Sequence, residues 1–248
     1  MTIPRIIHQI WWQGVENIPP KLKIASETWQ RLHPGWEYKL WDTESMEKLV
    51  KTDFPWFYEY YINYEYQIQR ADVIRYLFLY KYGGIYVDID ILCKKSLEPF
   101  IATELKSNLA FARSSHTGGY SNWFIISSAG NSFWPLLWKS LIDAYNYENC
   151  WKCVGKHLKV MHTTGPSILN NTINKHNIDC QGLTDGFNNC SVCDPQPCKC
   201  QDCYIVNMNA GGWNGWDSKF YNFVLCNWKK IILFMMLVVI GFYYCVRH

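Results

Sequence analysis

Two aspartates at spacing i, i+2, Asp88 and Asp90, are the residues that point most directly to chemistry. They alternate with the apolar residues Ile85, Val87 and Ile89, and this alternation predicts a short buried strand. On such a strand both carboxylates lie on one side, about 7 Å apart. Flanked by apolar residues, they are costly to bury without a partner but can share a hard cation, Mn²⁺ or Mg²⁺. Solvated acids at a strand end are the simpler alternative.

A helix is expected to end immediately before this strand. Its apolar residues recur at helical spacing and predict one apolar stripe: Ile68, Ala71, Ile74, Leu77 and Phe78. Asp72 and Arg75 are three residues apart on a neighbouring face, so the helix presents an acid and a base together. Gly83 suits the left-handed residue that ends a helix.

The remaining pattern alternates between strands and helices, which is typical of an open α/β sheet with ligand loops at the carboxyl ends of its strands. The expected elements are a strand over 6–10, a helix over 20–32, a strand over 36–40, a helix capped by Asp42, a strand over 122–127 and a helix from Asn131 to about Tyr145. The loop at 164–166 is expected to lead into a further helix, whose free amides could meet an anion.

Several stretches resemble, in order, the signature of glycosyltransferase family 32, the Asp-x-Asp sugar transferases that include yeast outer-chain and inositol phosphorylceramide mannosyltransferases. The stretches are 3–12, 33–42, 70–76, 82–90, 122–127 and 164–166. The resemblance covers most of residues 3 to 216. It implies a GT-A fold and a metal-dependent enzyme that transfers a hexose from a nucleotide sugar with retention of anomeric configuration.

The resemblance also implies roles for individual residues. Asp72 and Arg75 hold the donor sugar and its diphosphate, Asp88 binds ribose and metal, and Asp90 is the direct metal ligand. These four are the expected catalytic residues.

Other residues are expected to bind the donor. By the same resemblance, Trp11 stacks on the nucleotide base, Tyr86 packs near the ribose or phosphate, and Asn122 faces the sugar. An ordinary amide at a strand start is the alternative for Asn122. Trp213 or Trp216 is expected to cover the donor as a lid.

The chain departs from the family where a His-His-x-x-Gly-Ser-Trp type loop is common. Asn207 and Met208 stand at the two histidine positions. Asparagine still offers a carbonyl oxygen, so Asn207 is the third expected metal ligand, although imidazole suits a transition metal better. The change also favours an alternative function, a non-catalytic membrane-anchored module that binds sugar or acts as a scaffold.

The 11 cysteines gather mainly in the second half of the chain, where residues from about 180 to 203 are expected to form an insertion. Three Cys-x-x-Cys pairs stand out: Cys150 and Cys153, Cys190 and Cys193, and Cys200 and Cys203. Two such pairs complete a structural zinc site, whereas an oxidising compartment favours disulfides.

Residues 231–246 are apolar throughout and predict a single membrane anchor at 229–248, following a catalytic domain at 1–228. The chain opens without a signal-peptide pattern, and Lys229 and Lys230 precede the anchor. Both features favour a catalytic domain that faces the cytosol rather than the secretory lumen.

The composition limits the partners. A net charge of +3 without a basic run excludes a nucleic-acid-binding surface, and an aromatic content of 17% provides platforms for sugar rings. The expected donor is GDP-mannose, which much of the resembled family uses, with a UDP-hexose as the alternative. A glycolipid is the more natural acceptor for a membrane-bound enzyme, and a protein-linked glycan is the alternative.

Overall fold

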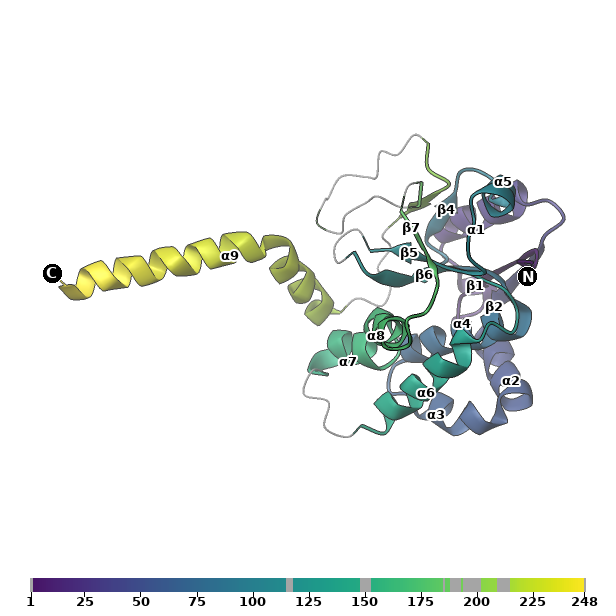
Figure 1. Ribbon diagram of the computed structural model, residues 1–248, viewed down its shortest axis with the longest axis horizontal. Coiled ribbons are helices and arrows are strands. Elements are labelled where there is room, and N and C mark those ends of the chain that lie inside the picture. Colours follow the sequence, from purple (N-terminus) through teal and green to yellow (C-terminus); the bar gives the residue numbers. More distant parts are fainter. Residues whose placement is uncertain are drawn as a thin grey trace.

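The computed structural model describes residues 2–114, 118–147, 153–184, 186–187, 193, 202–208 and 215–247 (Figure 1). Its main sheet has the strand order β2-β1-β3-β6-β5-β7. The strands are β1 (Ile6–Ile10), β2 (Glu37–Trp41), β3 (Gly84–Val87), β5 (Leu109–Arg113), β6 (Tyr120–Ser127) and β7 (Gln181–Leu183). β1 is parallel to β2 and β3, whereas β6 is antiparallel to both β3 and β5. The sheet is therefore mixed.

Helices cover both faces of this sheet. They are α1 (Pro20–Leu32), α2 (Thr43–Asp53), α3 (Tyr58–Asn63), α4 (Gln67–Tyr82), α5 (Glu98–Thr103), α6 (Phe133–Tyr145), α7 (Gly155–Thr163), α8 (Pro166–His176) and α9 (Trp216–Arg247). Alternation along β3 assigns its side chains to two cores: Tyr86 packs with α4 and α6 residues, whereas Ile85 and Val87 pack with α1 and α5 residues. The predicted α/β architecture with helices on either side is confirmed.

Helix α4 is more deeply buried than its single apolar stripe predicted. Nearly every residue from Gln69 to Leu79 is buried, including Asp72 and Arg75. The reason is that α4 is packed on several sides, against β3 and against α2, α6 and α7. Its two charged residues consequently lie inside the protein.

A glycine pair makes the joint between α4 and β3. Gly83 has φ 64° and Gly84 has φ 95°, both in the region that favours glycine. A Cβ on Gly84 would lie 2.4 Å from the Ile6 carbonyl oxygen of β1. The joint therefore lets α4 turn directly into a strand that pairs with β1.

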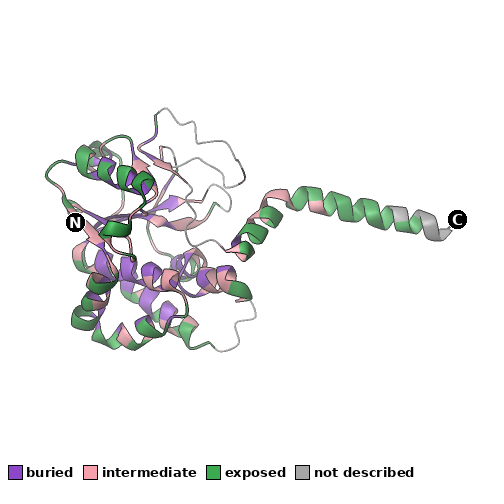
Figure 2. Ribbon diagram, turned by 180° about the vertical axis from the view of Figure 1, so that it is seen from behind, coloured by how far each residue is buried: buried purple, intermediate pink, exposed green. Residues whose placement is uncertain are grey.

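Helix α9 extends away from the rest of the molecule, and beyond its first turns most of its described residues are exposed (Figures 1 and 2). Among the described residues, Trp216–Ile240 is the one helical segment long and apolar enough to cross a membrane, and no residue of its most apolar 18-residue window is buried. The helix begins at Trp216. The prediction of an anchor that starts at residue 229 therefore concerns only the later part of one continuous helix.

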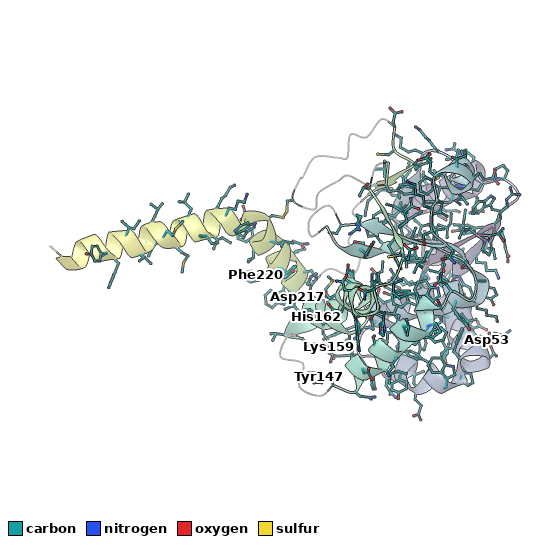
Figure 3. All side chains as sticks on the ribbon, in the orientation of Figure 1. Asp53, Tyr147, Lys159, His162, Asp217 and Phe220 are labelled. Atoms are coloured by element: carbon teal, nitrogen blue, oxygen red, sulfur yellow. A yellow bond between two sulfur atoms is a disulfide. The ribbon has the colours of Figure 1, made fainter. Side chains whose placement is uncertain are left out.

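The first turn of α9 is docked on α7 (Figure 3). Asp217 accepts a hydrogen bond from the His157 backbone N–H at 2.7 Å, and the buried Ser218 hydroxyl lies 3.0 Å from His157 Nδ1. The ring of Tyr221 lies against that of His157, with centroids 4.7 Å apart. These contacts attach the apolar helix to the body of the protein.

Among the described cysteines, those of the Cys-x-x-Cys pairs form disulfides and do not bind zinc, whereas Cys93 and Cys180 are free thiols. Cys193 is bonded to Cys226 of α9, and Cys153 and Cys203 also form disulfides. The zinc hypothesis is therefore wrong for Cys153, Cys193 and Cys203. The hypothesis fails at Cys193 because α9 brings Cys226, which belongs to none of the three Cys-x-x-Cys pairs, next to it. The other members of those pairs lie outside the described residues: Cys150, Cys190 and Cys200.

The glycine joint gives the first prediction. Gly84→Ala should lower the free energy of unfolding by more than about 3 kcal/mol, because a backbone clash is added to the usual cost of about 1–2 kcal/mol for a side chain at positive φ. Gly35→Ala is the matched control, since Gly35 has φ 83° but nothing within 4 Å of its Cβ position. Thermal unfolding in detergent, followed by tryptophan fluorescence, compares the two variants. Equal losses would contradict the clash.

Candidate active site

Asp88 lies just beyond the end of β3, and its two carboxylate oxygens have different surroundings. Oδ1 accepts hydrogen bonds from the Tyr86 hydroxyl and from Arg75 Nη1, the latter at 3.4 Å. Within the described part of the chain, Oδ2 has no hydrogen bond or ion pair, and 36% of the side chain is exposed. One oxygen is therefore fixed to the protein and the other is open to a ligand.

The alternating pattern predicted that both aspartates lie on one strand, and this prediction is wrong. β3 ends at Val87, and the Ile91 N–H donates to the Asp88 carbonyl, so residues 88–90 form a turn. The chain then pairs in a second, two-stranded sheet of β4 (Ile91–Cys93) and β8 (Ile205–Asn207). The turn ends the strand before its alternation reaches Asp90.

The second sheet brings the expected third ligand to the same turn. Ile91 pairs with Asn207, and the Met208 N–H donates to the Asp90 carbonyl at 2.9 Å. Asn207 is thus adjacent in register to the Asp88–Asp90 turn, although 117 residues separate Asp90 from Asn207 in the sequence. The metal roles of Asp88, Asp90 and Asn207 remain predictions.

Arg75 connects three elements at this site. From α4 its guanidinium makes an ion pair with Asp72 at 3.1 Å, reaches Asp88 of the β3 end and donates to the Asn122 carbonyl of β6 at 2.8 Å. It also lies over the Tyr86 ring, 4.5 Å from the centroid. Burial lowers the pKa of Arg75, but electrostatic interactions with Tyr86, Asp72 and Asp88 raise it on balance, so the guanidinium stays charged.

Asp72 is buried and fully engaged by the protein. Besides Arg75, it accepts from Asn122 Nδ2 at 2.9 Å and from the Thr164 hydroxyl at 3.0 Å. Burial raises its pKa to about 6, against the lowering effect of Arg75. The Asn122 amide also donates to the Tyr76 hydroxyl at 2.9 Å. Asp72 and Asn122 therefore hold Arg75 and one another in place.

Sequence reasoning missed two buried residues of β1 that support the site. Gln9 donates to the Asp88 carbonyl at 3.3 Å and accepts from the Tyr38 hydroxyl at 2.7 Å. His8 accepts from the Trp41 indole through Nδ1 and donates to the Gly83 carbonyl through Nε2. Burial lowers the pKa of His8 to about 3, which keeps the ring neutral for both bonds. The available signal was two polar residues inside an otherwise apolar strand.

The structure describes some, but not all, of the aromatic residues that are expected to contact the donor. Trp11 directly follows β1, is partly exposed and stacks on Trp12 with centroids 6.4 Å apart. Trp213 lies outside the described residues, and the other lid candidate, Trp216, is 80% exposed at the start of α9. The roles of Trp11 and Tyr86 in donor binding remain predictions.

The donor set fits a hard divalent cation that is completed by its substrate. Asp88 offers a carboxylate oxygen without a hydrogen bond among the described residues, and Asp90 in the same turn and Asn207, which pairs with Ile91, could supply further oxygen atoms. In the described ranges, no cluster of three or more His, Cys, Asp or Glu side chains is arranged to hold a metal ion. Three oxygen ligands would leave positions open for phosphate and water, as Mn²⁺ and Mg²⁺ prefer.

Comparisons with known proteins agree with this site. A family model described as "Glycosyltransferase sugar-binding region containing DXD motif" matches residues 19–106, which include α4, β3 and both aspartates. This part of the chain is similar to that glycosyltransferase family. The resemblance to family 32 is thereby confirmed.

The relatives include fungal and viral proteins. Inositol phosphoceramide mannosyltransferase 3 of Schizosaccharomyces pombe is 40% identical over 169 residues, 68% of this chain and 44% of the relative. An uncharacterized glycosyltransferase of Acanthamoeba polyphaga mimivirus is 28% identical over 220 residues, 85% of this chain and 84% of that protein. The chain thus spans less than half the length of the fungal relative.

A solved structure shows the same fold. The PaToxG glycosyltransferase has a TM-score of 0.53 and 18% identity, over 70% of each chain. This likeness of fold confirms the predicted GT-A type architecture.

The raised pKa of Asp72 gives the second prediction. A carboxyl that binds its proton more tightly in the folded state makes the protein less stable as pH rises through the window between its two pKa values, here about 4 to 6. Asp72→Asn removes this effect. The stability of the variant relative to wild type should therefore increase by about 3 kcal/mol between pH 4 and pH 7.

Thermal unfolding in detergent across this pH range measures the difference. Asp143→Asn, at an exposed position of α6, is the control and should show a constant difference from wild type. A difference for Asp72→Asn that stays constant or decreases with pH would contradict the assignment.

Proposed function

We propose that this chain is a retaining, divalent-metal-dependent hexosyltransferase that transfers mannose from GDP-mannose to a glycolipid. The observation that carries the metal-dependent part is the asymmetry of Asp88. Its Oδ1 is held by Tyr86 and Arg75, whereas its Oδ2 has no hydrogen bond or ion pair within the described part of the chain. A buried carboxylate with a purely structural role would be more stable with both of its oxygens hydrogen-bonded to the protein.

The residues have separate tasks in this proposal. Asp88 and Asp90 hold the cation, with Asn207 next to them, and the cation supplies positive charge that stabilises the departing diphosphate. Arg75 fixes the orientation of Asp88 and adds a positive charge of its own behind it. Asp72 acts by positioning Arg75, because it is only 4% exposed and bonded to three partners.

The sugar and the acceptor are proposed from the relatives. The fungal relative is named an inositol phosphoceramide mannosyltransferase, which supports mannose as the sugar and a phosphorylated glycolipid as the acceptor. An apolar helix docked directly on α7 supports a lipid acceptor, since it would keep the enzyme at the membrane surface. The acceptor hydroxyl would attack the anomeric carbon from the side of the leaving group, as the bond to the diphosphate breaks. The departing phosphate oxygen would take the hydroxyl proton, so no side chain is assigned as general base.

The disulfide bears on membrane orientation. Bonds such as Cys193–Cys226 persist in oxidising compartments and are rare in the cytosol. We therefore propose that the catalytic domain faces the lumen of the secretory pathway, opposite to the orientation favoured by Lys229 and Lys230. Arg247 and His248 would then lie on the cytosolic side, where positive charge is preferred.

The metal mechanism gives the third prediction. Asp90→Asn in the full chain should lower Mn²⁺-dependent hydrolysis of GDP-mannose by about 10²–10³-fold, the usual effect of removing one preorganised electrostatic contact. Asp143→Asn makes the same chemical change at an exposed site and should leave hydrolysis unchanged. Equal hydrolysis in both variants would contradict the metal site. Hydrolysis of UDP-hexoses alone would replace the proposed donor and keep the mechanism.

The orientation gives the fourth prediction. In sealed microsomes containing the full chain, the catalytic domain should resist added protease while a tag placed after His248 is digested. Reduction should release two thiols from Cys193 and Cys226, measured by mass shift after alkylation. A catalytic domain that is digested while the vesicles remain sealed would show that it faces the cytosol.

A further inference from the structure

Helix α9 is longer than a bilayer requires. It has 32 residues and is therefore about 48 Å long, whereas the hydrocarbon core of a bilayer is about 30 Å thick. A helix of this length that crosses at an ordinary tilt leaves several turns outside the hydrocarbon. Figures 1 and 2 both show a bend after the first turns of α9, so the beginning of the helix runs in a different direction from the rest.

The beginning of α9 is the part that would stay outside the hydrocarbon. Cys226 is bonded to Cys193 and the first turn is docked on His157, so residues 216–226 are tied to the body of the protein. Lys229 and Lys230 follow and are exposed. Lysine is tolerated at the edge of the hydrocarbon, where its ammonium group reaches the head groups, but not inside it. The hydrocarbon would therefore begin after Lys230, and residues 216–228 form a proximal segment outside it.

The proximal segment has one face on the body and one face turned away from it. The first face contacts α7 through Asp217, Ser218 and Tyr221. Four apolar residues at spacing i, i+4, i+7 and i+8 share the other, outer face. They are Trp216, Phe220, Phe223 and Val224, and the first three are at least 60% exposed. Within the part of the chain that the structure describes, nothing covers this outer face.

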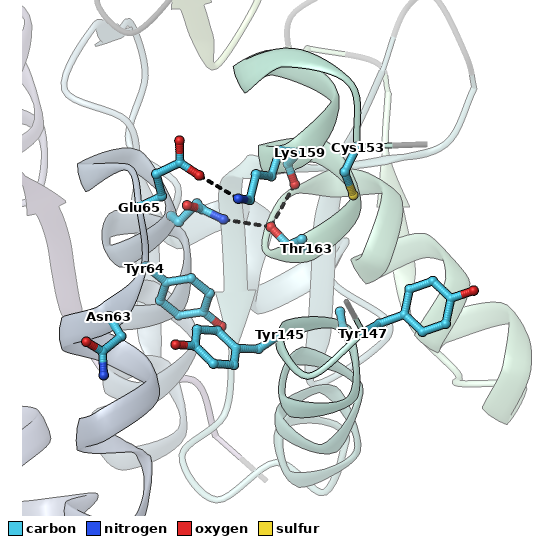
Figure 4. Close-up of a pocket in the computed structure, with 10 residues that line it drawn as sticks. Asn63, Tyr64, Glu65, Tyr145, Tyr147, Cys153, Lys159 and Thr163 are labelled. Carbon is cyan, nitrogen blue, oxygen red and sulfur yellow. Dashed lines mark hydrogen bonds and ion pairs between the residues drawn. The ribbon is translucent and has the colours of Figure 1, made fainter. Parts of the chain in front are cut away.

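Exposed side chains of the body extend this apolar surface. Val154 is exposed and precedes Gly155, where a Cβ would lie 3.5 Å from an Asp217 carboxylate oxygen, so Val154 adjoins the start of α9. Tyr147 is also exposed, and Figure 4 shows its ring directed away from the cavity beside α7. Figure 3 places Tyr147 and Phe220 on the side of the body from which α9 extends. That side of the body therefore carries apolar groups of its own.

The charges around the outer face favour a lipid surface as its partner. Lys219, Lys229 and Lys230 are exposed, whereas the nearby acids are engaged: Asp217 accepts from the His157 N–H, and Glu65 is paired with Lys159 (Figure 4). Exposed aromatic rings combined with lysines are typical of helices that lie in the head-group region of a bilayer. A second copy of this chain would instead bring like charges together.

We propose that the proximal segment is a bilayer-binding surface, which lies along the head-group region of the membrane that the later part of α9 crosses. Trp216, Phe220 and Phe223 insert among the head groups, and Lys219 lies near the lipid phosphates. The contacts with α7 and the bond to Cys193 then hold the body against the bilayer, not at the end of a projecting helix. The proposal does not depend on the donor, the metal or transferase activity.

Photo-cross-linking of the full chain in phosphatidylcholine nanodiscs tests this surface. The photoreactive residue p-benzoylphenylalanine replaces Phe220 or Phe223, and mass spectrometry of the intact protein detects covalently attached lipid. We expect lipid adducts at both positions, with a yield comparable to that from the same replacement at Leu237 in the later part of α9. Trp56, an exposed aromatic residue between α2 and α3, is the matched control and should give no adduct.

The outcomes are distinct. Adducts at Leu237 without adducts at Phe220 and Phe223 would show that the proximal segment stands clear of the bilayer, and would overturn the proposal. A cross-linked dimer at Phe220 or Phe223 would show that a second copy covers the outer face and overturn it as well. Absence of an adduct at Leu237, or equal adducts at Trp56 and Phe220, would remove its basis. Unchanged melting temperatures exclude misfolding of the variants.

Discussion

The structure depends on one buried charge. Arg75 is 3% exposed, and a buried cation is tolerated only when it is paired and hydrogen-bonded. Asp72 and Asp88 supply the negative charges, and the Asn122 carbonyl and the Tyr86 ring complete its surroundings. Because these groups come from α4, the end of β3, and β6, satisfying Arg75 fixes three elements relative to one another. The same constraint uses one oxygen of Asp88 and leaves the other for a ligand.

The remaining structure keeps this arrangement rigid. The Gly83–Gly84 joint lets α4 lie directly against the strand whose end carries Asp88, and His8 fixes the joint by bonding to the Gly83 carbonyl. Gln9 holds the Asp88 backbone from the neighbouring strand. Helix α7, which ends next to Thr164 and Asp72, attaches the apolar helix α9 to the body through His157. A site built on packed strands and helices is thus joined, without a long linker, to a helix that is long and apolar enough to cross a membrane.

The parts that could be predicted from the sequence are those with a local signal. The stretch from Arg70 to Asp90 gave α4, the glycine joint, and the acidic and basic residues of the site. Nonlocal contacts gave no such signal. The antiparallel pairing of β6 with β3, the second sheet beside Asp90 and the Cys193–Cys226 bond all join segments tens to more than a hundred residues apart. His8 and Gln9 were missed because a strand pattern shows that they are buried but not which groups they bond.

The central claim is that the Asp88–Asp90 turn holds a divalent cation that receives the donor diphosphate. Anomalous diffraction from crystals of the full chain grown with Mn²⁺ and GDP tests it most directly. We predict a manganese peak within bonding distance of Asp88 Oδ2 and Asp90, with the diphosphate on its open side and Arg75 still paired to Asp88 Oδ1. A bound nucleotide with no manganese peak at these carboxylates, or with Asp88 turned away from Arg75, would contradict the account.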